Sequence, residues 1–140
     1  MQAMRDWLGP LHYSPQIGHS LGERMQHAFN KNFTDKPRKI ILIGTDCPAL
    51  SSSIISMALD GLTKHNLVIG PSHDGGYFLI GLKQSCDSLF HNIDWGTDTV
   101  LSQTIHKAEQ NNLLVHTLEY QHDIDQPEDL QYLRNHPGFK

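Results

Sequence analysis

Residues 40–50 read IILIGTDCPAL, and this stretch decides the fold. Its first four residues are large and aliphatic, a continuous apolar run that is typical of a strand buried on both faces of a sheet. Asp46 follows this run after Gly44 and Thr45, and Pro48 prevents the strand from continuing. In open α/β sheets, ligands bind outside the carboxyl ends of the strands. Asp46 is therefore either a ligand for a hard cation such as Mg²⁺ or a turn residue that bonds backbone N–H groups.

The composition is that of one soluble globular domain, covering residues 1–140. Of these residues 38% are hydrophobic and 19% charged, and the formal net charge is −4. This charge argues against nucleic acid as a main partner, and no apolar run approaches the roughly 20 residues that span a membrane. The two cysteines form no C-x-x-C pair, and the ten histidines show no metal-ligand spacing. The N-terminus has no signal-peptide pattern, so we expect a cytoplasmic location.

Strands and amphipathic helices alternate along the chain. Apolar spacing predicts helices over 21–29, from a serine cap at 51–53 to Asn66, from Thr97 or Asp98 to 111, and from 125 onward. Strands are predicted over 39–45, 67–69, 77–82 and 113–120, with a loop over 30–39. This alternation predicts an α/β sheet with helices on both faces, and an antiparallel strand at 77–82 would make the sheet mixed.

A second cluster, SHDGGYFLIG, covers residues 72–81. Asp-Gly-Gly between two apolar runs is an ordinary hairpin signal, because glycine reaches positive φ without cost. The functional alternative is that Gly75 and Gly76 let a ligand approach the backbone. Asp74 would then accept hydrogen bonds from ligand hydroxyls, and Tyr77 would supply a flat face.

A third cluster, HDIDQPEDL, covers residues 122–130. Asp125 and Glu128 resemble a helix capping box. In an extended backbone, however, Asp123 and Asp125 point to the same side, and two carboxylates on one face favour a compensating cation. If this segment lies near the strand that ends before Asp46, the two strand ends could share one metal.

Two smaller features have both a functional and a structural interpretation. Trp95 to Thr97 could form a platform that stacks on a sugar, although an aromatic ring packed over a helix start is the more common arrangement. Arg24 on the first helix could meet an anion, although a solvated arginine is the more common case.

Taken together, these segments resemble a known family. The resemblance rests on QIGHSLGERM (16–25), IILIGTDCPAL (40–50), GPSHDGGYFLIGL (70–82), IDWGTDTVL (93–101) and DIDQPEDL (123–130), in this order. The chain resembles the radical-SAM/selenodomain-associated transferases, a DUF-type glycosyltransferase family of the nucleotide-diphospho-sugar transferase superfamily. This resemblance implies a three-layer α/β/α, Rossmann-like GT-A fold with a mostly parallel mixed sheet.

The resemblance also implies an activity and a set of site residues. The reaction would transfer the sugar of a nucleotide-diphospho-sugar to a small-molecule acceptor, with the nucleoside diphosphate as leaving group, and would use Mg²⁺ or Mn²⁺. Asp46 and Asp125, with Asp123 beside it, match the metal positions, and Asp46 and Asp74 match catalytic carboxylates. The substrate side would comprise Thr45, Asp74, Gly75, Gly76, Tyr77, Trp95 and Thr97.

One departure from the family pattern concerns the N-terminus. Family members begin with a strand and a glycine-containing basic loop that cradles the nucleotide, and no such segment precedes Gln16. We therefore expect an N-terminally truncated GT-A domain with an exposed sheet edge, which another subunit of a homo-oligomer could cover. Two alternatives to the glycosyltransferase stay open: a nucleotidyltransferase of the same superfamily, and an inactive domain that serves as a binding or assembly module.

Overall fold

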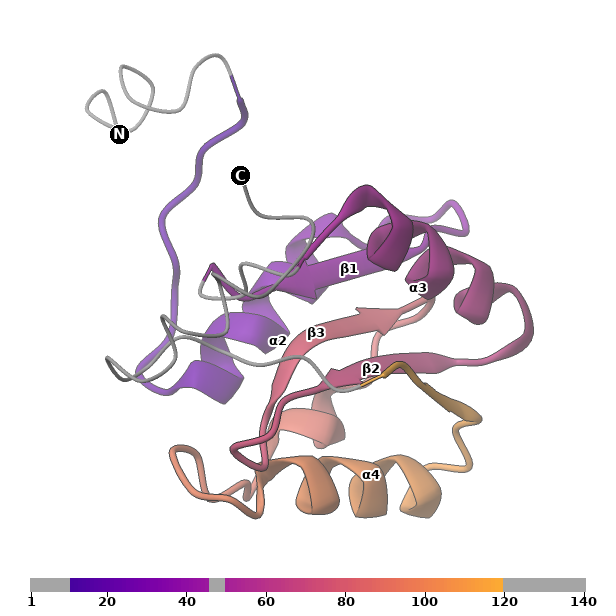
Figure 1. Cartoon of the computed structure of the whole chain (residues 1–140). Helices are drawn as coiled ribbons and strands as arrows, with labels where there is room; N and C mark the ends of the chain where they lie inside the picture. Colours follow the sequence, from indigo (N-terminus) through magenta and orange to yellow (C-terminus); the bar gives the residue numbers. More distant parts are fainter. Residues whose placement is uncertain (1–10, 46–49, 120–140) are drawn as a thin grey trace, which may run out of the picture.

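The computed structural model describes residues 11–45 and 50–119, and a four-stranded sheet lies at its centre (Figure 1). In spatial order the strands are β1 (Ile40–Ile43), β3 (Tyr77–Leu82), β2 (Leu67–Pro71) and β4 (Val115–Thr117). β3 is antiparallel to both of its neighbours, whereas β2 and β4 pair in parallel. β1, β2 and β4 therefore run in one direction, which confirms a mixed sheet in which most strands share a direction.

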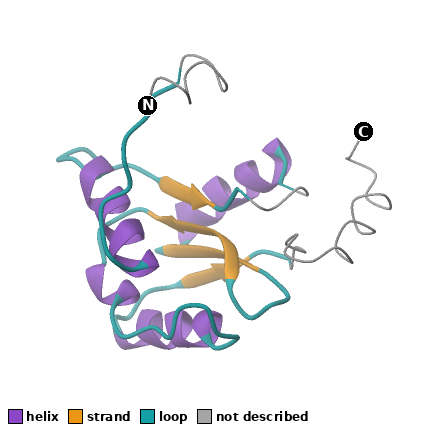
Figure 2. Cartoon of the chain, turned by 90° about the vertical axis from the view of Figure 1, so that its left-hand side faces the viewer, coloured by secondary structure: helices purple, strands orange, loops and turns teal. Residues whose placement is uncertain are grey.

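Helices cover both faces of this sheet, which confirms the three-layer α/β/α arrangement (Figure 2). One face carries α2 (Leu21–Asn32), the 3₁₀ helix η1 (Asp87–Phe90) and α4 (Val100–Gln110). The other face carries α3 (Ser52–Lys64), whose Ala58 and Leu62 are fully buried against the sheet. Within the described ranges, no helix has the length and apolar composition needed to cross a membrane.

Local interactions explain where the helices begin and end. α3 begins after Ser51, whose hydroxyl accepts a hydrogen bond from the Ile54 N–H, as the serine cluster predicted. The predicted loop over 30–39 was wrong at its start, because α2 continues to Asn32. Phe33 follows α2 and stacks on the buried Phe29 with ring centroids 6.0 Å apart, and its N–H donates to the Phe29 carbonyl at 2.9 Å.

Two predicted strands are shorter in the structure. β1 begins at Ile40 and ends at Ile43, so Gly44 and Thr45 follow it as non-strand residues. β4 covers Val115–Thr117 instead of 113–120.

A bulge in β3 changes the direction in which Tyr77 points. Gly70 pairs with Leu79 and Pro71 pairs with Tyr77, so Phe78 is an extra residue in the ladder. Phe78 therefore joins Leu79 on the α3 face, and Tyr77 joins Ile80 on the face that α2 and α4 cover. Strict alternation of side chains would have placed Tyr77 on the opposite face.

The Asp-Gly-Gly segment forms the turn between β2 and β3, which confirms the hairpin prediction. The Asp74 carboxylate accepts a hydrogen bond from the Gly76 N–H at 3.0 Å, and the Gly76 carbonyl accepts one from the Ser72 N–H at 3.0 Å. Gly75 has φ +89°, a conformation that side chains with a Cβ rarely adopt. The turn therefore requires glycine at this position.

This turn also sets the start of α4. The Gly75 carbonyl accepts a hydrogen bond of 2.8 Å from the Leu101 N–H, which belongs to the first turn of the helix. The predicted caps Thr97 and Asp98 were wrong, because the helix begins after Thr99 and Thr99 makes no side-chain capping bond. A carbonyl from a distant turn takes the place of the local cap.

We predict that Gly75→Ala destabilises the fold by roughly 2–5 kcal/mol. A Cβ at this position would collide with the Asp98 backbone, so the cost of overpacking adds to that of the positive φ. Gly96→Ala is the matched control, because Gly96 has φ +82° but nothing within 4 Å of its Cβ position. Urea unfolding should show that the control loses roughly 1–2 kcal/mol of its free energy of unfolding. Equal losses of unfolding free energy in both variants would contradict the role of the Asp98 contact.

Candidate functional site

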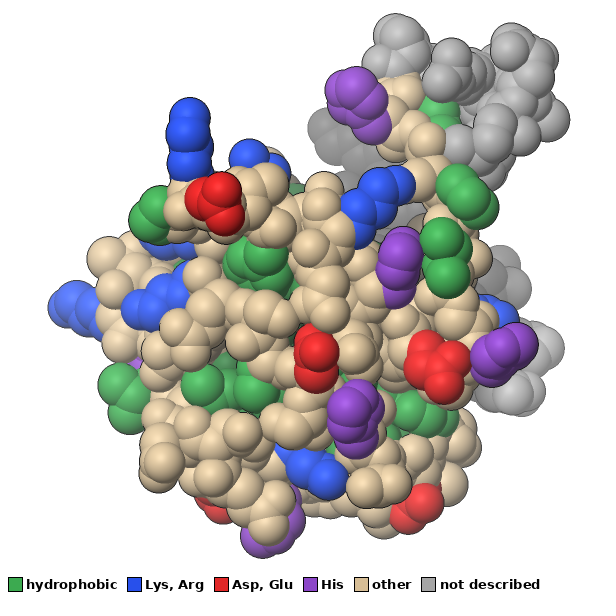
Figure 3. All heavy atoms as spheres, turned by 180° about the vertical axis from the view of Figure 1, so that it is seen from behind, with side chains coloured by type: hydrophobic (Ala, Val, Ile, Leu, Met, Phe, Trp, Pro, Cys, Tyr) green, Lys and Arg blue, Asp and Glu red, His purple; other side chains and the backbone are tan. Residues whose placement is uncertain are grey.

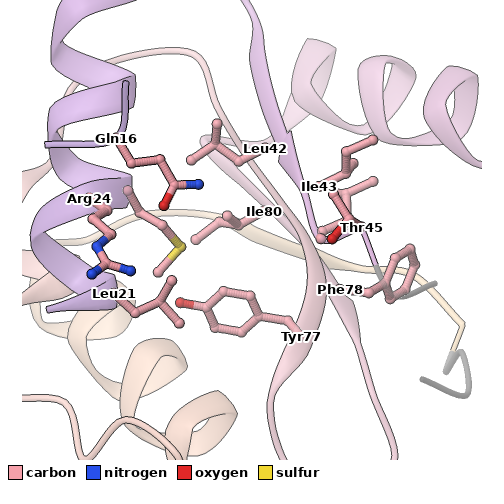
Figure 4. Close-up of a pocket in the computed structure, with 12 residues that line it drawn as sticks. Gln16, Leu21, Arg24, Leu42, Ile43, Thr45, Tyr77, Phe78 and Ile80 are labelled. Carbon is pink, nitrogen blue, oxygen red and sulfur yellow. The ribbon is translucent and has the colours of Figure 1, made fainter. Parts of the chain in front are cut away.

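One pocket of the described chain lies between the start of α2 and the neighbouring strands β1 and β3 (Figure 4). Its volume is about 420 Å³, within the range of small-molecule sites. We call it the α2–β1–β3 pocket. It is lined by Gln16, Leu21, Arg24, Met25, Leu42, Ile43, Gly44, Thr45, Tyr77, Phe78, Leu79 and Ile80.

A network of local hydrogen bonds builds the α2 side of the pocket. The Ser20 hydroxyl accepts from the Glu23 N–H at 3.1 Å, and the Glu23 carboxylate accepts from the His19 N–H at 2.6 Å. The bond to His19 lowers the pKa of Glu23, so this carboxylate stays ionised and keeps the helix start in place. The network determines the orientation of the first turn of α2, which carries Leu21 and Arg24.

Gly18 brings the preceding segment close to this first turn. Its φ is +137°, and a Cβ there would lie 2.7 Å from Glu23 Cβ and 2.8 Å from the Arg24 nitrogen. The Gly18 carbonyl accepts a hydrogen bond from Arg24 Nε at 3.3 Å. Glycine is therefore required for a chain reversal that holds the Arg24 side chain beside the pocket.

Arg24 is the one charged side chain among the twelve residues that line the pocket. Its only hydrogen bond within the described residues uses Nε, which leaves the two terminal nitrogens without an acceptor there. A guanidinium with both terminal nitrogens available can bind a carboxylate or phosphate through two parallel bonds. The pocket thus has a single positive charge beside largely apolar walls.

Tyr77 forms part of the pocket wall, and its hydroxyl is directed toward Leu21 (Figure 4). Burial raises the pKa of Tyr77 to about 12, and the hydroxyl of Thr104 opposes this shift. The two hydroxyls do not reach hydrogen-bonding geometry, and within the described chain neither has a partner. Tyr77 is therefore a neutral phenol at every physiological pH.

The predicted substrate residues fall into two groups. Thr45 and Tyr77 both line the pocket, where Thr45 is the last described residue before Asp46. Asp74 is exposed, and neither it nor Gly75 or Gly76 lines the pocket. These three residues form the hairpin turn, and their predicted roles toward substrate stay predictions.

Trp95 and Thr97 also make contacts within the protein. Trp95 packs over the start of α2, where a Cβ added to Gly22 would lie 2.8 Å from the Trp95 ring. This is the helix-start packing considered from the sequence, although the helix is α2 and not the following α4. The Thr97 hydroxyl donates to the Asp94 carbonyl at 2.6 Å and lies 2.7 Å from the Thr99 hydroxyl. Their sugar-binding roles stay predictions.

The three predicted metal ligands, Asp46, Asp123 and Asp125, lie outside the described residues. Across 11–45 and 50–119, no group of three or more His, Cys, Asp or Glu side chains is arranged to hold a metal ion. Histidine side chains are spread over the face shown in Figure 3, and the rings of His65 and His116 lie 5.0 Å apart. The described part of the chain therefore offers no second candidate metal centre.

Comparison with known proteins identifies the family. Residues 1–97 match the model of DUF2064, described as an uncharacterized protein conserved in bacteria. The chain belongs to the DUF2064 family. Every residue that lines the α2–β1–β3 pocket lies inside the matched range. The comparison with curated proteins gave no match.

A solved structure places this DUF2064 chain in a superfamily. The chain is similar to a protein from Desulfovibrio desulfuricans G20 that is described as a candidate nucleotide-diphospho-sugar transferase, with 36% sequence identity and a TM-score of 0.90. The match covers 96% of the present chain and 59% of the other protein. This confirms the nucleotide-diphospho-sugar transferase superfamily and a GT-A-like fold.

Sequence reasoning did not identify Gln16 as a pocket residue of this DUF2064 chain, and for Arg24 it left an anion contact open beside a solvated side chain. Gln16 precedes the helix, and a solvated arginine was the more common interpretation of Arg24. The available signal was the Ser-x-x-Glu pattern at 20–23, which marks a helix start, preceded by a glycine at Gly18. These features could predict a tight reversal, but not which strands lie opposite it.

The buried phenol gives a pH-dependent prediction. Because the pKa of Tyr77 is raised to about 12, the unfolded state loses its phenol proton first as the pH rises above about 10. The stabilisation from burying the neutral phenol is complete below pH 10 and is lost between pH 10 and 12, by roughly 2 kcal/mol. In Tyr77→Phe this part of the alkaline loss should be absent, as measured by urea unfolding at pH 9 and 11.5. Parallel alkaline profiles in the two proteins would contradict it.

Proposed function

We propose that this chain carries the substrate pocket of a metal-dependent glycosyltransferase that acts on a nucleotide-diphospho-sugar. The observation that carries the proposal is the similarity to the Desulfovibrio protein, since 36% identity extends over 96% of the present chain. The chain spans 59% of that protein's length, so the activity of the whole protein belongs to the proposal. The α2–β1–β3 pocket supports it, because the pocket reaches the carboxyl end of β1, where α/β folds commonly bind ligands.

In this proposal the chain's own residues position the acceptor and exclude water. Leu42 and Ile80 provide an apolar floor, and Thr45 marks the end of the pocket that is closest in sequence to Asp46. An acceptor held on this floor would have its reactive group oriented by the pocket walls, which reduces the entropic cost of reaching the transition state.

We further propose that Asp46, Asp123 and Asp125 hold Mg²⁺ or Mn²⁺. Three carboxylates supply the hard oxygen donors that these cations prefer, which fits the donor chemistry although the structure describes none of the three residues. A bound divalent cation would neutralise the diphosphate leaving group.

We predict that Asp46→Asn weakens Mn²⁺ binding at least tenfold and lowers glycosyl transfer from a panel of nucleotide-diphospho-sugars, because it removes a charged ligand. Calorimetry with Mn²⁺ and detection of released nucleoside diphosphate provide the two measurements. Asp60→Asn, at an exposed position of α3 away from the pocket, is the matched control. Equal Mn²⁺ affinity in both variants would refute the metal role of Asp46.

The products of the same assay separate the alternative functions. A glycosyltransferase releases a nucleoside diphosphate, whereas a nucleotidyltransferase given a nucleoside triphosphate and a sugar phosphate releases pyrophosphate. Absence of both products, with no heat on adding nucleotide sugar and Mn²⁺, would instead support a binding or assembly module.

We also propose that a second copy of the chain pairs along β1, which among the described strands pairs with β3 alone.

Two substitutions at Asp74 separate its turn role from the predicted catalytic role. Asp74→Asn keeps a side-chain oxygen that can accept the Gly76 N–H, whereas Asp74→Ala removes it and should cost roughly 0.5–1.5 kcal/mol in thermal or urea unfolding. If the carboxylate also takes the acceptor proton, Asp74→Asn should lower the turnover about 10²-fold or more with unchanged stability. Full activity of Asp74→Asn would restrict Asp74 to the turn.

A further inference from the structure

We infer that the α2–β1–β3 pocket binds an amphipathic organic anion, with its phosphate or carboxylate group on Arg24 and its apolar body along the strands. Nothing in the family match or in the similar structure assigns a ligand to these residues. The identification of this anion as the acceptor of the transfer reaction rests on the proposed function, whereas the binding site itself does not.

The first observation is the chemistry of the lining. Seven of the twelve lining residues are large apolar side chains, and Arg24 is the one charged group among them. Within the described residues Arg24 forms no ion pair, and its terminal nitrogens have no acceptor. A ligand that contacts both the apolar lining and the Arg24 guanidinium needs an anionic group at one end and an apolar body at the other.

The second observation is the exposure of the pocket walls. Leu21 is 52% exposed and Ile43 is 46% exposed, and these two side chains line the pocket from α2 and β1 respectively. Large apolar side chains that stay exposed beside a concave site are typical of a binding surface, because a ligand can remove them from water.

The third observation is which residues lie at the two ends of the pocket. Figure 4 shows Arg24 and Thr45 at opposite ends of the pocket, with Leu42 and Ile80 between them. An anion on Arg24 would therefore direct the rest of the ligand along the apolar floor toward Thr45. If the proposed function holds, the group that receives the sugar lies at this far end, which makes the acceptor an amphipathic acid with its reactive group remote from its charge.

Arg24 is held in place by features that a merely solvated arginine would not need. The Gly18 reversal and the Ser20–Glu23 bonds both set the position of the turn that carries it. The Nε bond to the Gly18 carbonyl orients the guanidinium while leaving its terminal nitrogens available.

The test measures binding to the whole 140-residue chain by calorimetry or ligand-observed NMR, without nucleotide or metal. The probes are hexyl phosphate, hexanoate, inorganic phosphate and hexanol. We expect hexyl phosphate or hexanoate to bind at least tenfold more tightly than inorganic phosphate and hexanol, and the stronger of the two identifies the anionic group. Arg24→Gln should weaken that binding at least tenfold.

Arg38→Gln is the matched control, because Arg38 is also exposed and also donates to one backbone carbonyl, that of Asn32. Ile43→Ser supplies a second variant at a half-exposed wall position, and it should weaken binding of the amphiphile without affecting inorganic phosphate. Equal affinity of the amphiphiles and inorganic phosphate, or equal binding by the two arginine variants, would overturn the inference. Because no nucleotide sugar is present, a failed transfer assay would refute the proposed function and leave this binding result intact.

Discussion

The close contact between the β2–β3 turn and the start of α4 is the constraint on which the rest of the described structure depends. Gly75 adopts a positive φ, its Cα lies against the Asp98 backbone, and its carbonyl accepts the Leu101 N–H. The turn thereby joins the two central strands and holds the helix that covers Tyr77 on one face of the sheet. A backbone carbonyl can replace a side-chain cap only where the two chains approach this closely, and a Cβ would keep them apart.

A second glycine-dependent reversal, at Gly18, builds the other side of the same pocket. Both junctions place backbone where a Cβ would collide, and both end beside residues that line the pocket, Arg24 in one case and Tyr77 in the other. The bulge at Phe78 completes the arrangement, because it turns Tyr77 to the α2 face. The pocket is therefore a product of local backbone geometry at three separate places in the chain.

The pocket also relates the described chain to its family. Its lining lies wholly within the DUF2064 match and includes Thr45, the residue before Asp46. Its lining has a neutral phenol, exposed aliphatic side chains and a guanidinium whose terminal nitrogens have no acceptor within the described residues. This gives it the polarity of a site for an amphipathic ligand. In the proposed function the acceptor uses this pocket, whereas the metal uses residues that are not part of its lining.

The sequence by itself determined the fold class, the alternation of elements, the hairpin at Asp74–Gly76 and the helix cap at Ser51, because each depends on residues within a few positions of one another. It also led to the superfamily, through the order of several motifs. The tertiary structure decided the cap of α4, the direction of Tyr77 and the place of Arg24 and Gln16 in the pocket. Leu101 meets Gly75, and Arg24 lies across from β1 and β3, so these partners are distant in sequence. Tyr77 is instead turned by a bulge in the local pairing of β3 with β2, which regular strand alternation does not predict. Periodicity and propensity carry no information about such partners, since they depend on how separate elements pack.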